Sequence, residues 1–308
     1  MIFITLTLTL PHQGGGKQWV SGWALTSFIN RMIPKLIISA LARLWYRLDR
    51  RHRLITLRNL EFAYGAALTR SQRESLAQEV FKQFMWLFWE GLEMLILPLS
   101  YLKKKVVIIG QENFEAALAH GCGVLAITAH AGNWEYTVLG YGLQYQPVAV
   151  VAREQDHPAL NRLIRFLRGR GHNWMIAKQG GLQAIIAHLK QNHIVGVVID
   201  QNTTTKGGVL VDFFGHRART TPMAAILARR LGTPVVPVFS RRLPQGRHLL
   251  VIQPPLPLVK TSDAQTDILV QVQAQSRAIE AWVRRYPEQW LWLHKRWKNQ
   301  YPELYQNL

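Results

Sequence analysis

Apolar and polar positions follow two patterns along this chain, and the pattern changes near residue 105. Before that point, apolar residues recur at helical spacing over 76–97, and Ser71 and Glu74 have the spacing of a helix-capping box. After it, short apolar runs alternate with helical patterns. The apolar runs predict strands at 106–109, 124–128, 148–152, 174–177, 195–199, 235–239 and 249–252. The helical patterns predict helices at 134–143, 158–167, 182–190, 222–231 and 263–285.

Strands that alternate with helices predict an α/β fold with a largely parallel central sheet flanked by helices. We therefore expect an α/β core over 105–308, preceded by a helical, membrane-associating region over 1–104. A chain of 308 residues with 48% hydrophobic content is long enough for one such domain with a helical appendage.

The apolar segments of the N-terminal region are too short or too interrupted for an ordinary transmembrane helix of about 20 mostly uncharged residues. The stretch 2–10 is short and lacks the features of a signal peptide. The stretch 19–44 is broken by charges and a proline, and 86–99 carries Glu90 and Glu93. We expect helices that pack into the core or lie in the membrane surface, with a short N-terminal span as the alternative.

The charge balance indicates an anionic partner. Lysine and arginine total 37 against 18 acidic residues, a formal charge of +19. Leu41, Leu44, Trp45 and Leu48 lie at helical spacing among arginines, and the stretch 290–301 interleaves tryptophans with cations. Both segments fit basic helices on an anionic bilayer, or core tryptophans beside solvated cations. The pattern leaves both interpretations open.

The single cysteine, Cys122, excludes an internal disulfide and a cysteine-based zinc cluster. Its place beside the strand at 124–128 favours a small core residue over a nucleophile. No metal site is expected.

A histidine and a carboxylate stand five positions apart just beyond that strand, in His130-Ala131-Gly132-Asn133-Trp134-Glu135. His130 then lies at the carboxyl end of a strand, where open α/β sheets place their ligand crevices. Glu135 falls in the first turn of the following helix, and we expect it to reach back to the imidazole. A histidine oriented by a carboxylate forms a general base near neutral pH. A polar pair without a catalytic role is the alternative.

Polar residues also follow two other strands. Arg153 comes after the strand at 148–152, and Asp200 and Gln201 come after the strand at 195–199. In a parallel sheet these ends converge with His130, which predicts a binding site there. Arg153 has the chemistry to grip a phosphate, and Asp200 to orient a sugar hydroxyl, anchor Arg153 or cap a turn.

The segment 211–222 joins two aromatic residues, Phe213 and Phe214, to two arginines, Arg217 and Arg219. We expect Thr221 to cap the next helix, whose amino end with adjacent arginines suits phosphate. A buried phenylalanine pair flanked by solvated cations is the alternative.

In these motifs the chain resembles the bacterial lipid A biosynthesis acyltransferases, the lauroyl/myristoyl transferase family within the His-x4-Asp/Glu lysophospholipid acyltransferase superfamily. The likeness spans about residues 35–300 and departs from the family's frequent Asp-Gln-Asp at Asn202. It is carried by His130 to Glu135, Val151 to Arg153, Asp200-Gln201, Phe213-Phe214-Gly215, Thr220 to Met223, Asn59-Leu60-Glu61 and the stretch 287–296.

The resemblance implies acyl transfer from an acyl-carrier-protein or acyl-CoA thioester to a hydroxyl of a lipid A-type precursor, at the cytoplasmic face of a bacterial inner membrane. His130 would remove the hydroxyl proton while Glu135 holds the ring, with no acyl-enzyme and no cofactor. Backbone N–H groups at Gly132 and Asn133 would stabilise the oxyanion. Arg153, Arg217 and Arg219 would meet acceptor phosphates, with Asp200 and Gln201 also binding substrate. Phe213, Phe214 and the helix 86–97 would line an acyl channel.

Two alternatives differ in kind. The acceptor could be a phosphatidylinositol mannoside, an ornithine lipid or a lysophospholipid, with the same chemistry at His130. A non-enzymatic nucleic-acid-binding protein fits the charge, but the chain has no known nucleic-acid-binding motif and its aromatic residues are embedded in apolar stretches. We therefore expect no nucleic-acid partner.

Overall fold

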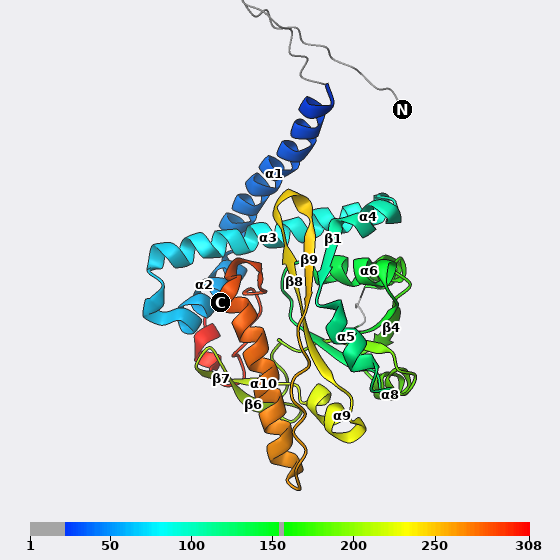
Figure 1. Cartoon of the computed structure of the whole chain (residues 1–308). Helices are drawn as coiled ribbons and strands as arrows, with labels where there is room; N and C mark the ends of the chain where they lie inside the picture. Colours follow the sequence, from blue (N-terminus) through cyan, green and yellow to red (C-terminus); the bar gives the residue numbers. More distant parts are fainter. Residues whose placement is uncertain (1–21, 154–156) are drawn as a thin grey trace, which may run out of the picture.

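The computed structural model describes residues 22–153 and 157–308, so the predicted apolar segment 2–10 lies outside the described residues. A seven-stranded sheet forms the centre of the chain (Figure 1). The sheet strands are β1 (Val106–Ile109), β2 (Val124–Thr128), β3 (Val148–Ala152), β4 (Trp174–Ala177), β5 (Ile194–Val198), β8 (Val235–Arg242) and β9 (His248–Ile252). Two further strands, β6 (Val209–Phe213) and β7 (His216–Thr220), form a separate hairpin.

Helices precede the sheet and connect its strands. The α-helices are α1 (Gly22–Leu48), α2 (Arg50–Tyr64), α3 (Arg70–Ile96), α4 (Leu99–Lys105), α5 (Gln111–Leu118), α6 (Trp134–Gln144), α7 (Pro158–Gly169), α8 (Leu182–Lys190), α9 (Met223–Leu231) and α10 (Ala264–Arg285). Short 3-10 turns occur at Gly65–Ala67, Pro244–Gly246, Pro287–Gln289 and Pro302–Tyr305.

The strand order is β1-β9-β8-β2-β5-β3-β4, and every neighbouring pair is parallel except β8 with β9. The predicted α/β fold with a largely parallel sheet is therefore confirmed. All seven predicted sheet strands are present, because each is a continuous apolar run of the kind that a sheet covered on both faces requires.

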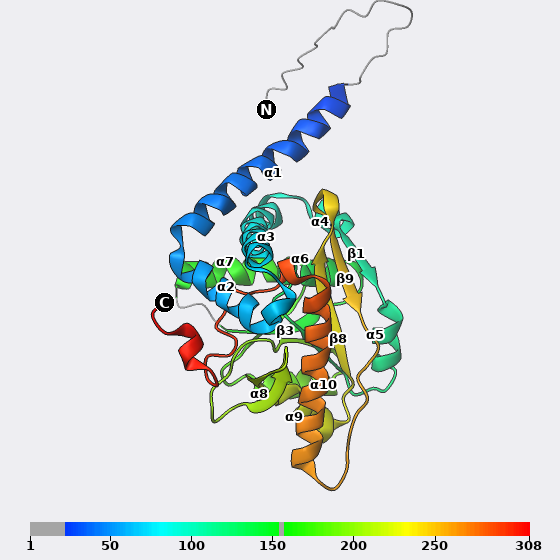
Figure 2. The ribbon, with the colours of Figure 1, turned by 90° about the vertical axis from the view of Figure 1, so that its left-hand side faces the viewer.

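Helical layers cover both faces of the sheet, and the alternation of side chains along β2 separates them. Leu125 and Ile127 belong to one core, which includes residues of α2, α3, α8, α9 and α10. Val124 and Ala126 belong to a second core, with residues of α4, α5 and α6. Figures 1 and 2 show α10 running along the sheet and α1 leading away from it.

The N-terminal region is helical, as predicted. Leu60 of α2 and Val80 of α3 belong to the same core as the sheet, and a domain boundary near residue 104 stays a prediction. The capping box of α3 lies two residues earlier than predicted, because Thr69 accepts from the Gln72 N–H and the Gln72 side chain accepts from Thr69. Among residues 22–153 and 157–308, no helix combines the length and apolar character needed to cross a bilayer.

The hairpin β6–β7 was not predicted, because Ala218 is the one apolar residue of β7 and the strand has no apolar pattern. Its two turn residues, Phe214 and Gly215, both have positive φ, at 57° and 76°. Two consecutive left-handed residues match the right-handed twist of paired strands. The hairpin packs on α10 through Ser276, whose hydroxyl donates to the Asp212 carbonyl.

The C-terminal tryptophans are core residues. Trp290, Trp292 and Trp297 are at most 1% exposed and pack with Phe213 and Phe214. Of the two interpretations left open for this stretch, the core one holds for its tryptophans.

Candidate active site

His130 and Asp200 lie at the same edge of the sheet because β2 and β5 are parallel neighbours. Their register pairs the last residues of the two strands, Thr128 with Val198. His130 and Asp200 each follow their strand by two positions. The predicted convergence of these two strand ends is therefore confirmed.

Asp200 orients the imidazole, which corrects the role predicted for Glu135. Nδ1 of His130 lies 2.7 Å from one carboxylate oxygen of Asp200, and the His130 backbone N–H donates to the other at 2.9 Å. The Trp290 indole N–H donates to this second oxygen at 2.8 Å. Asp200 is 3% exposed and serves the histidine, a role that was not among the alternatives given for it from the sequence.

These contacts determine the tautomer of His130. A carboxylate only accepts hydrogen bonds, so Nδ1 carries the hydrogen and Nε2 keeps its lone pair. The His130 side chain is 19% exposed. Asp200 occupies only the Nδ1 side of the ring, so the lone pair of Nε2 is chemically able to accept a proton.

The electrostatics of the pair favour a basic histidine. Burial lowers the pKa of His130, but the charge and hydrogen bond of Asp200 outweigh burial and raise this pKa above its ordinary value. Burial raises the pKa of Asp200, but the charge and hydrogen bonds of His130 lower it to about 2. Asp200 is therefore ionised at neutral pH and supports an imidazolium when His130 takes a proton.

Glu135 lies in the first turn of α6, as predicted, but its carboxylate does not bond the imidazole. Arg168 of α7 donates to both carboxylate oxygens, from Nε at 2.6 Å and from Nη2. The Trp134 indole N–H donates to the same carboxylate at 3.1 Å. A bidentate guanidinium–carboxylate pair is strong and directional, so Glu135 joins α6 to α7.

The loop between His130 and α6 is held by the segment after α10. The Leu291 N–H donates to the His130 carbonyl at 3.1 Å, and the Gly132 N–H donates to the Gln289 carbonyl at 2.9 Å. Gly132 is therefore already paired, which overturns its predicted role as an oxyanion donor. Gly132 has a φ of +61°, and a Cβ there would lie 2.5 Å from the Ser240 carbonyl oxygen, so only glycine fits.

Asn133 is the N-cap of α6, and its side chain is buried at 2% exposure. Its amide oxygen accepts from the Tyr136 N–H at 2.9 Å, and its amide nitrogen donates to Glu90 at 2.7 Å. Both ends of this side-chain amide are therefore occupied within the protein. The backbone N–H of Asn133 stays a predicted oxyanion donor.

The remaining strand-end residues are on the surface. Arg153 follows β3 and Gln201 follows Asp200, and both are exposed. The Gln201 carbonyl accepts from the buried Arg296 at 3.1 Å. Substrate binding by Arg153 and by the Gln201 side chain stays a prediction.

The two arginines of β7 differ in their surroundings. Arg217 is 53% exposed and lies 3.9 Å from the equally exposed Asp212. Arg219 donates to the carbonyls of Thr205 and Gly208 at 3.1 and 2.9 Å, and to the Gln300 side chain at 3.0 Å. Arg219 therefore braces the loop before β6, which corrects its predicted phosphate contact.

The predicted acyl-channel residues are core rings in the structure. Phe213 and Phe214 are 1% and 4% exposed. Their rings pack at 5.0 Å, Phe213 lies against Trp290 at 5.5 Å, and Arg284 lies 4.3 Å over Phe214. The alternative of a buried pair beside a cation holds, so the channel prediction is wrong for these two rings.

Cys122 precedes β2 instead of lying in it, and it is partly exposed, with its sulfur 3.4 Å from the Gly232 carbonyl oxygen. It is therefore not the core residue that its position suggested. In the part of the chain that the structure describes, no three histidine, cysteine or acidic side chains gather as metal ligands would.

His294 and Arg296, which belong to the motif at 287–296, contact the residues that directly follow Asp200. The Asn202 N–H donates to Nε2 of His294 at 3.0 Å, and Arg296, only 1% exposed, donates to Thr220 at 2.6 Å. They hold the chain after Asp200 against the C-terminal segment. The tryptophan-rich pattern of 287–296 is the sequence feature that could have indicated these two residues.

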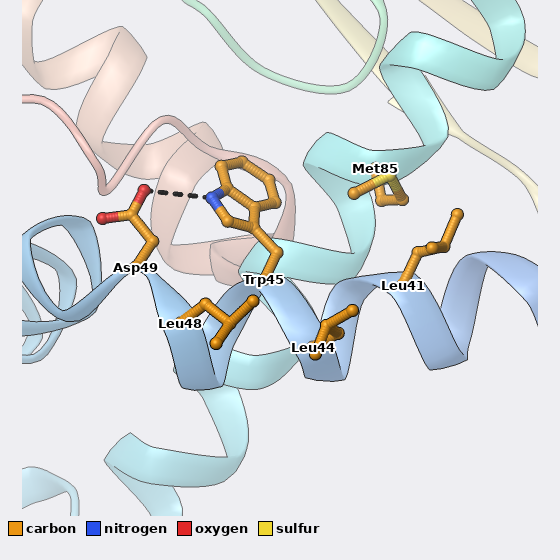
Figure 3. A pocket seen from close by; sticks show the side chains of 6 residues that line it. All are labelled: Leu41, Leu44, Trp45, Leu48, Asp49 and Met85. Carbon is orange, nitrogen blue, oxygen red and sulfur yellow. Dashed lines mark hydrogen bonds between the residues drawn. The ribbon is translucent and has the colours of Figure 1, made fainter.

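An apolar surface lies on α1 and α3, and α3 is also the helix whose Glu90 accepts from Asn133. An open pocket there is lined by Leu41, Leu44, Trp45, Leu48, Asp49 and Met85 (Figure 3). The Trp45 indole N–H donates to Asp49 at 3.0 Å, which holds the ring in the pocket wall. Over residues 34–48 of α1 and over α3, the large apolar side chains that are exposed are Leu36, Ile37, Leu41, Leu44, Leu48, Phe88, Leu92 and Ile96.

Comparison with known proteins gives one consistent result. Residues 15–299 match the family described as bacterial lipid A biosynthesis acyltransferase. A lipid A biosynthesis lauroyltransferase of Escherichia coli is 27% identical over 84% of this chain and 83% of its own length. A phosphatidylinositol mannoside acyltransferase of Mycolicibacterium smegmatis is 24% identical over 68% of each chain. A 1-acyl-sn-glycerophosphate acyltransferase structure from Thermotoga maritima covers 85% of this chain and 99% of its own at 18% identity, with a TM-score of only 0.37.

Proposed function

Because the chain belongs to the bacterial lipid A biosynthesis acyltransferase family and is thus an O-acyltransferase, we propose that it moves a fatty acyl group from an acyl-carrier-protein or acyl-CoA thioester to a hydroxyl of a lipid A-type precursor. The His130–Asp200 pair carries this proposal. It presents an imidazole nitrogen that no described residue occupies, beside a buried carboxylate, at the edge of the sheet where α/β proteins bind ligands.

The reaction follows from that geometry. Nε2 of His130 takes the proton of the acceptor hydroxyl while the oxygen of that hydroxyl attacks the thioester carbonyl carbon. The tetrahedral intermediate collapses, the carbon–sulfur bond breaks, and the imidazolium returns the proton to the leaving thiolate. Asp200 stabilises the imidazolium, which would be costly if buried without a partner. The step needs no acyl-enzyme and no cofactor beyond the thioester co-substrate.

The developing oxyanion requires hydrogen-bond donors. Gly132 and Asn133 were the two backbone donors expected from the sequence. Since the Gly132 N–H donates to the Gln289 carbonyl, the remaining donor is the backbone N–H of Asn133, at the amino end of α6. A helix amino end also contributes partial positive charge there. Glu135 and Arg168 act by holding this end of α6 against α7.

The acceptor and its phosphates would meet the exposed cations nearest the strand ends. Arg153 follows β3, which is separated from β2 only by β5 in the sheet. Exposed Arg217, on the β6–β7 hairpin, is a second candidate. The formal charge of +19 supports an anionic acceptor and an acidic donor carrier in general terms.

The apolar surface of α1 and α3 is the proposed contact with the cytoplasmic face of the bacterial inner membrane. Leu44 and Leu48 are 52% and 74% exposed on α1, and Phe88 is 66% exposed on α3. Exposed Arg43 and Arg47 lie among the α1 leucines, where they would meet anionic headgroups. This arrangement supports the amphipathic interpretation of the α1 segment, in contrast to the C-terminal tryptophans.

A second candidate is acyl transfer to another lipid acceptor. The mannoside acyltransferase named above shares 24% identity over 68% of this chain, and the His130 chemistry would be unchanged. The family match gives no support to the nucleic-acid-binding alternative.

The test is product analysis with the purified full chain in vesicles. Lauroyl-carrier-protein and lauroyl-CoA are supplied in turn with a lipid A-type precursor, a phosphatidylinositol mannoside or a lysophospholipid, and products are identified by mass spectrometry. We expect one added acyl group on the lipid A-type precursor and one thiol released per transfer. Transfer to another acceptor alone selects the second candidate, and hydrolysis without transfer overturns both.

A further inference from the structure

A buried ion pair lies beneath the loop that carries His130, and the proposed reaction does not use it. Arg242, at the end of β8, donates to both carboxylate oxygens of Glu90 in α3, from Nε and from Nη2, each at 2.6 Å. Their side chains are 8% and 2% exposed. A buried pair of this kind often contributes little net stability compared with apolar residues, so its position in the fold is the informative feature.

One connection runs from Glu90 to the start of α6. The Asn133 amide nitrogen donates to the same Glu90 oxygen that Arg242 Nη2 contacts, at 2.7 Å. The Asn133 amide oxygen caps the helix by accepting from Tyr136. Both ends of the Asn133 amide are therefore fixed, and with them the backbone three residues after His130.

A second connection runs from Arg242 to Gly132. The Arg242 backbone N–H donates to the Gln289 side-chain oxygen at 2.7 Å, and the Gln289 amide donates back to the Arg242 carbonyl at 3.2 Å. The Gln289 carbonyl accepts from the Gly132 N–H. Adjacent loop residues are thus anchored through separate routes, Asn133 to the Glu90 carboxylate and Gly132, through Gln289, to the backbone of Arg242.

We propose that Glu90 and Arg242 are positioning residues for acyl transfer, which hold the backbone of Gly132 and Asn133 at the distance from His130 that the transition state requires. The inference rests on the proposed function, since it assigns these residues to that same site. Neither residue touches substrate. A loop that shifts by about 1 Å is expected to lower the rate by up to about 10²-fold.

The test reverses the direction of the hydrogen bond between positions 90 and 133, so that the donor becomes the acceptor. Asn133→Asp keeps the helix cap, because aspartate caps as well as asparagine, but it sets two carboxylates against each other. Glu90→Gln removes the charge that orients Arg242. In the double variant, the amide nitrogen introduced at position 90 donates to the carboxylate introduced at position 133, which restores that bond, whereas Arg242 keeps an acceptor for Nε but loses its acceptor for Nη2.

The readouts are kcat, KM and the melting temperature of the full chain in vesicles. We expect each single variant to lose kcat by about tenfold or more with KM little changed, and the double variant to recover part of the loss of Asn133→Asp, because it restores the bond between positions 90 and 133 but not the bidentate pair. Amide hydrogen exchange over 130–136 should rise in the single variants and fall again in the double variant. Unchanged kcat in the single variants, or a double variant no faster than Asn133→Asp, overturns the proposal.

Asp267→Asn is the matched control. Asp267 is 1% exposed and bonds Arg229 at 2.7 Å, but this pair joins α10 to α9. It should lower the melting temperature without changing kcat. A kcat loss in Asp267→Asn equal to that of Glu90→Gln overturns the positioning role.

If neither single variant folds, Arg242→Lys keeps the buried charge and removes the bidentate geometry. A lower kcat at constant KM then supports the proposal, and wild-type kcat overturns it. Failure of the proposed function has a different signature, because wild-type protein would then transfer no acyl group to any hydroxyl acceptor.

Discussion

Asp200 accepts two hydrogen bonds from His130, which lies seventy positions earlier in the sequence. The backbone N–H donates at 2.9 Å and the ring nitrogen Nδ1 at 2.7 Å. The carboxylate thus fixes the ring and the backbone that carries it at the same time. Trp290 supplies a third donor from the C-terminal segment. Three donors to one buried carboxylate explain why it stays ionised beside a buried histidine.

His130→Ala should remove acyl transfer while the fold remains. General-base assistance is worth about 10²–10⁴-fold, and a loss within that range is expected because no other group in the pair can take the proton. Thioester turnover is measured by thiol release, with circular dichroism and vesicle binding as controls. Wild-type turnover in a folded variant would refute the proposed mechanism.

The pH dependence of the rate should reveal the influence of Asp200. His130 acts as a base only when neutral, so the rate rises with pH through its pKa, which Asp200 raises above the ordinary value of 6.5. In Asp200→Asn, burial is no longer outweighed, so the acid limb of kcat/KM should move to lower pH while the maximal rate falls. A limb that stays in place would contradict the coupling.

Glu135 and Arg168 should behave as one unit. Because they form a bidentate pair, Glu135→Gln and Arg168→Gln are each expected to lower kcat, and the double variant to lose little more than either single variant. The cycle is measured from kcat for the four proteins. Additive losses would show that the two residues act independently. A complete loss of activity in Glu135→Gln, with activity retained in Arg168→Gln, would indicate that Glu135 acts on the imidazole of His130.

The α1 surface should determine vesicle binding. Leu44→Asp places a charge on the proposed membrane face, whereas Leu269→Asp makes the same change on α10, where the leucine is 44% exposed against 52% for Leu44. Cosedimentation with anionic phosphatidylglycerol vesicles should weaken in the first variant only. Equal binding by both variants would place the membrane contact elsewhere.

Acid should destabilise the fold through His248. Burial, the largest influence, and the charges of Arg242 and Lys105 lower its pKa to about 4, although Glu90 opposes them. Between the ordinary 6.5 and 4, the unfolded chain binds more protons, so the free energy of unfolding falls as pH drops through this window. The full effect is on the order of 3 kcal/mol.

Urea unfolding at several pH values measures this slope. His248→Phe keeps a ring to stack on Tyr136, which lies 4.4 Å away, and should flatten the stability profile between pH 6.5 and 4. His120→Gln alters an exposed histidine and should leave the profile unchanged. The idea fails if the two variants share the wild-type slope.

Local patterns were sufficient for most of the fold and for part of the site. The strand at 124–128 is a continuous apolar run, so its place was clear, and the residues after it were correctly expected at a sheet edge. The hairpin was missed because 216–220 carries no apolar pattern. The hydrophobic contacts that hold it come from Phe213 and from the distant Trp297.

The same distinction explains the two carboxylates. Glu135 is near His130 in sequence, and nothing local shows that the first turn of α6 aims it at Arg168 of α7. Asp200 becomes the partner only because β5 pairs with β2 in register. The sequence around Glu90 indicates a buried ion pair, since a carboxylate inside an apolar helix requires a buried partner, but it does not show that this partner is Arg242.

By itself, the sequence determined the alternation of strands and helices, the histidine beyond β2 and the excess of positive charge, because periodicity and residue chemistry are local properties. Only the tertiary structure decided which carboxylate holds that histidine, which arginines are occupied and which tryptophans are buried. Those outcomes depend on strand order and on packing between segments up to about 250 positions apart, as in the Arg58 bonds to the C-terminal carbonyls. Local propensity contains no information about such contacts.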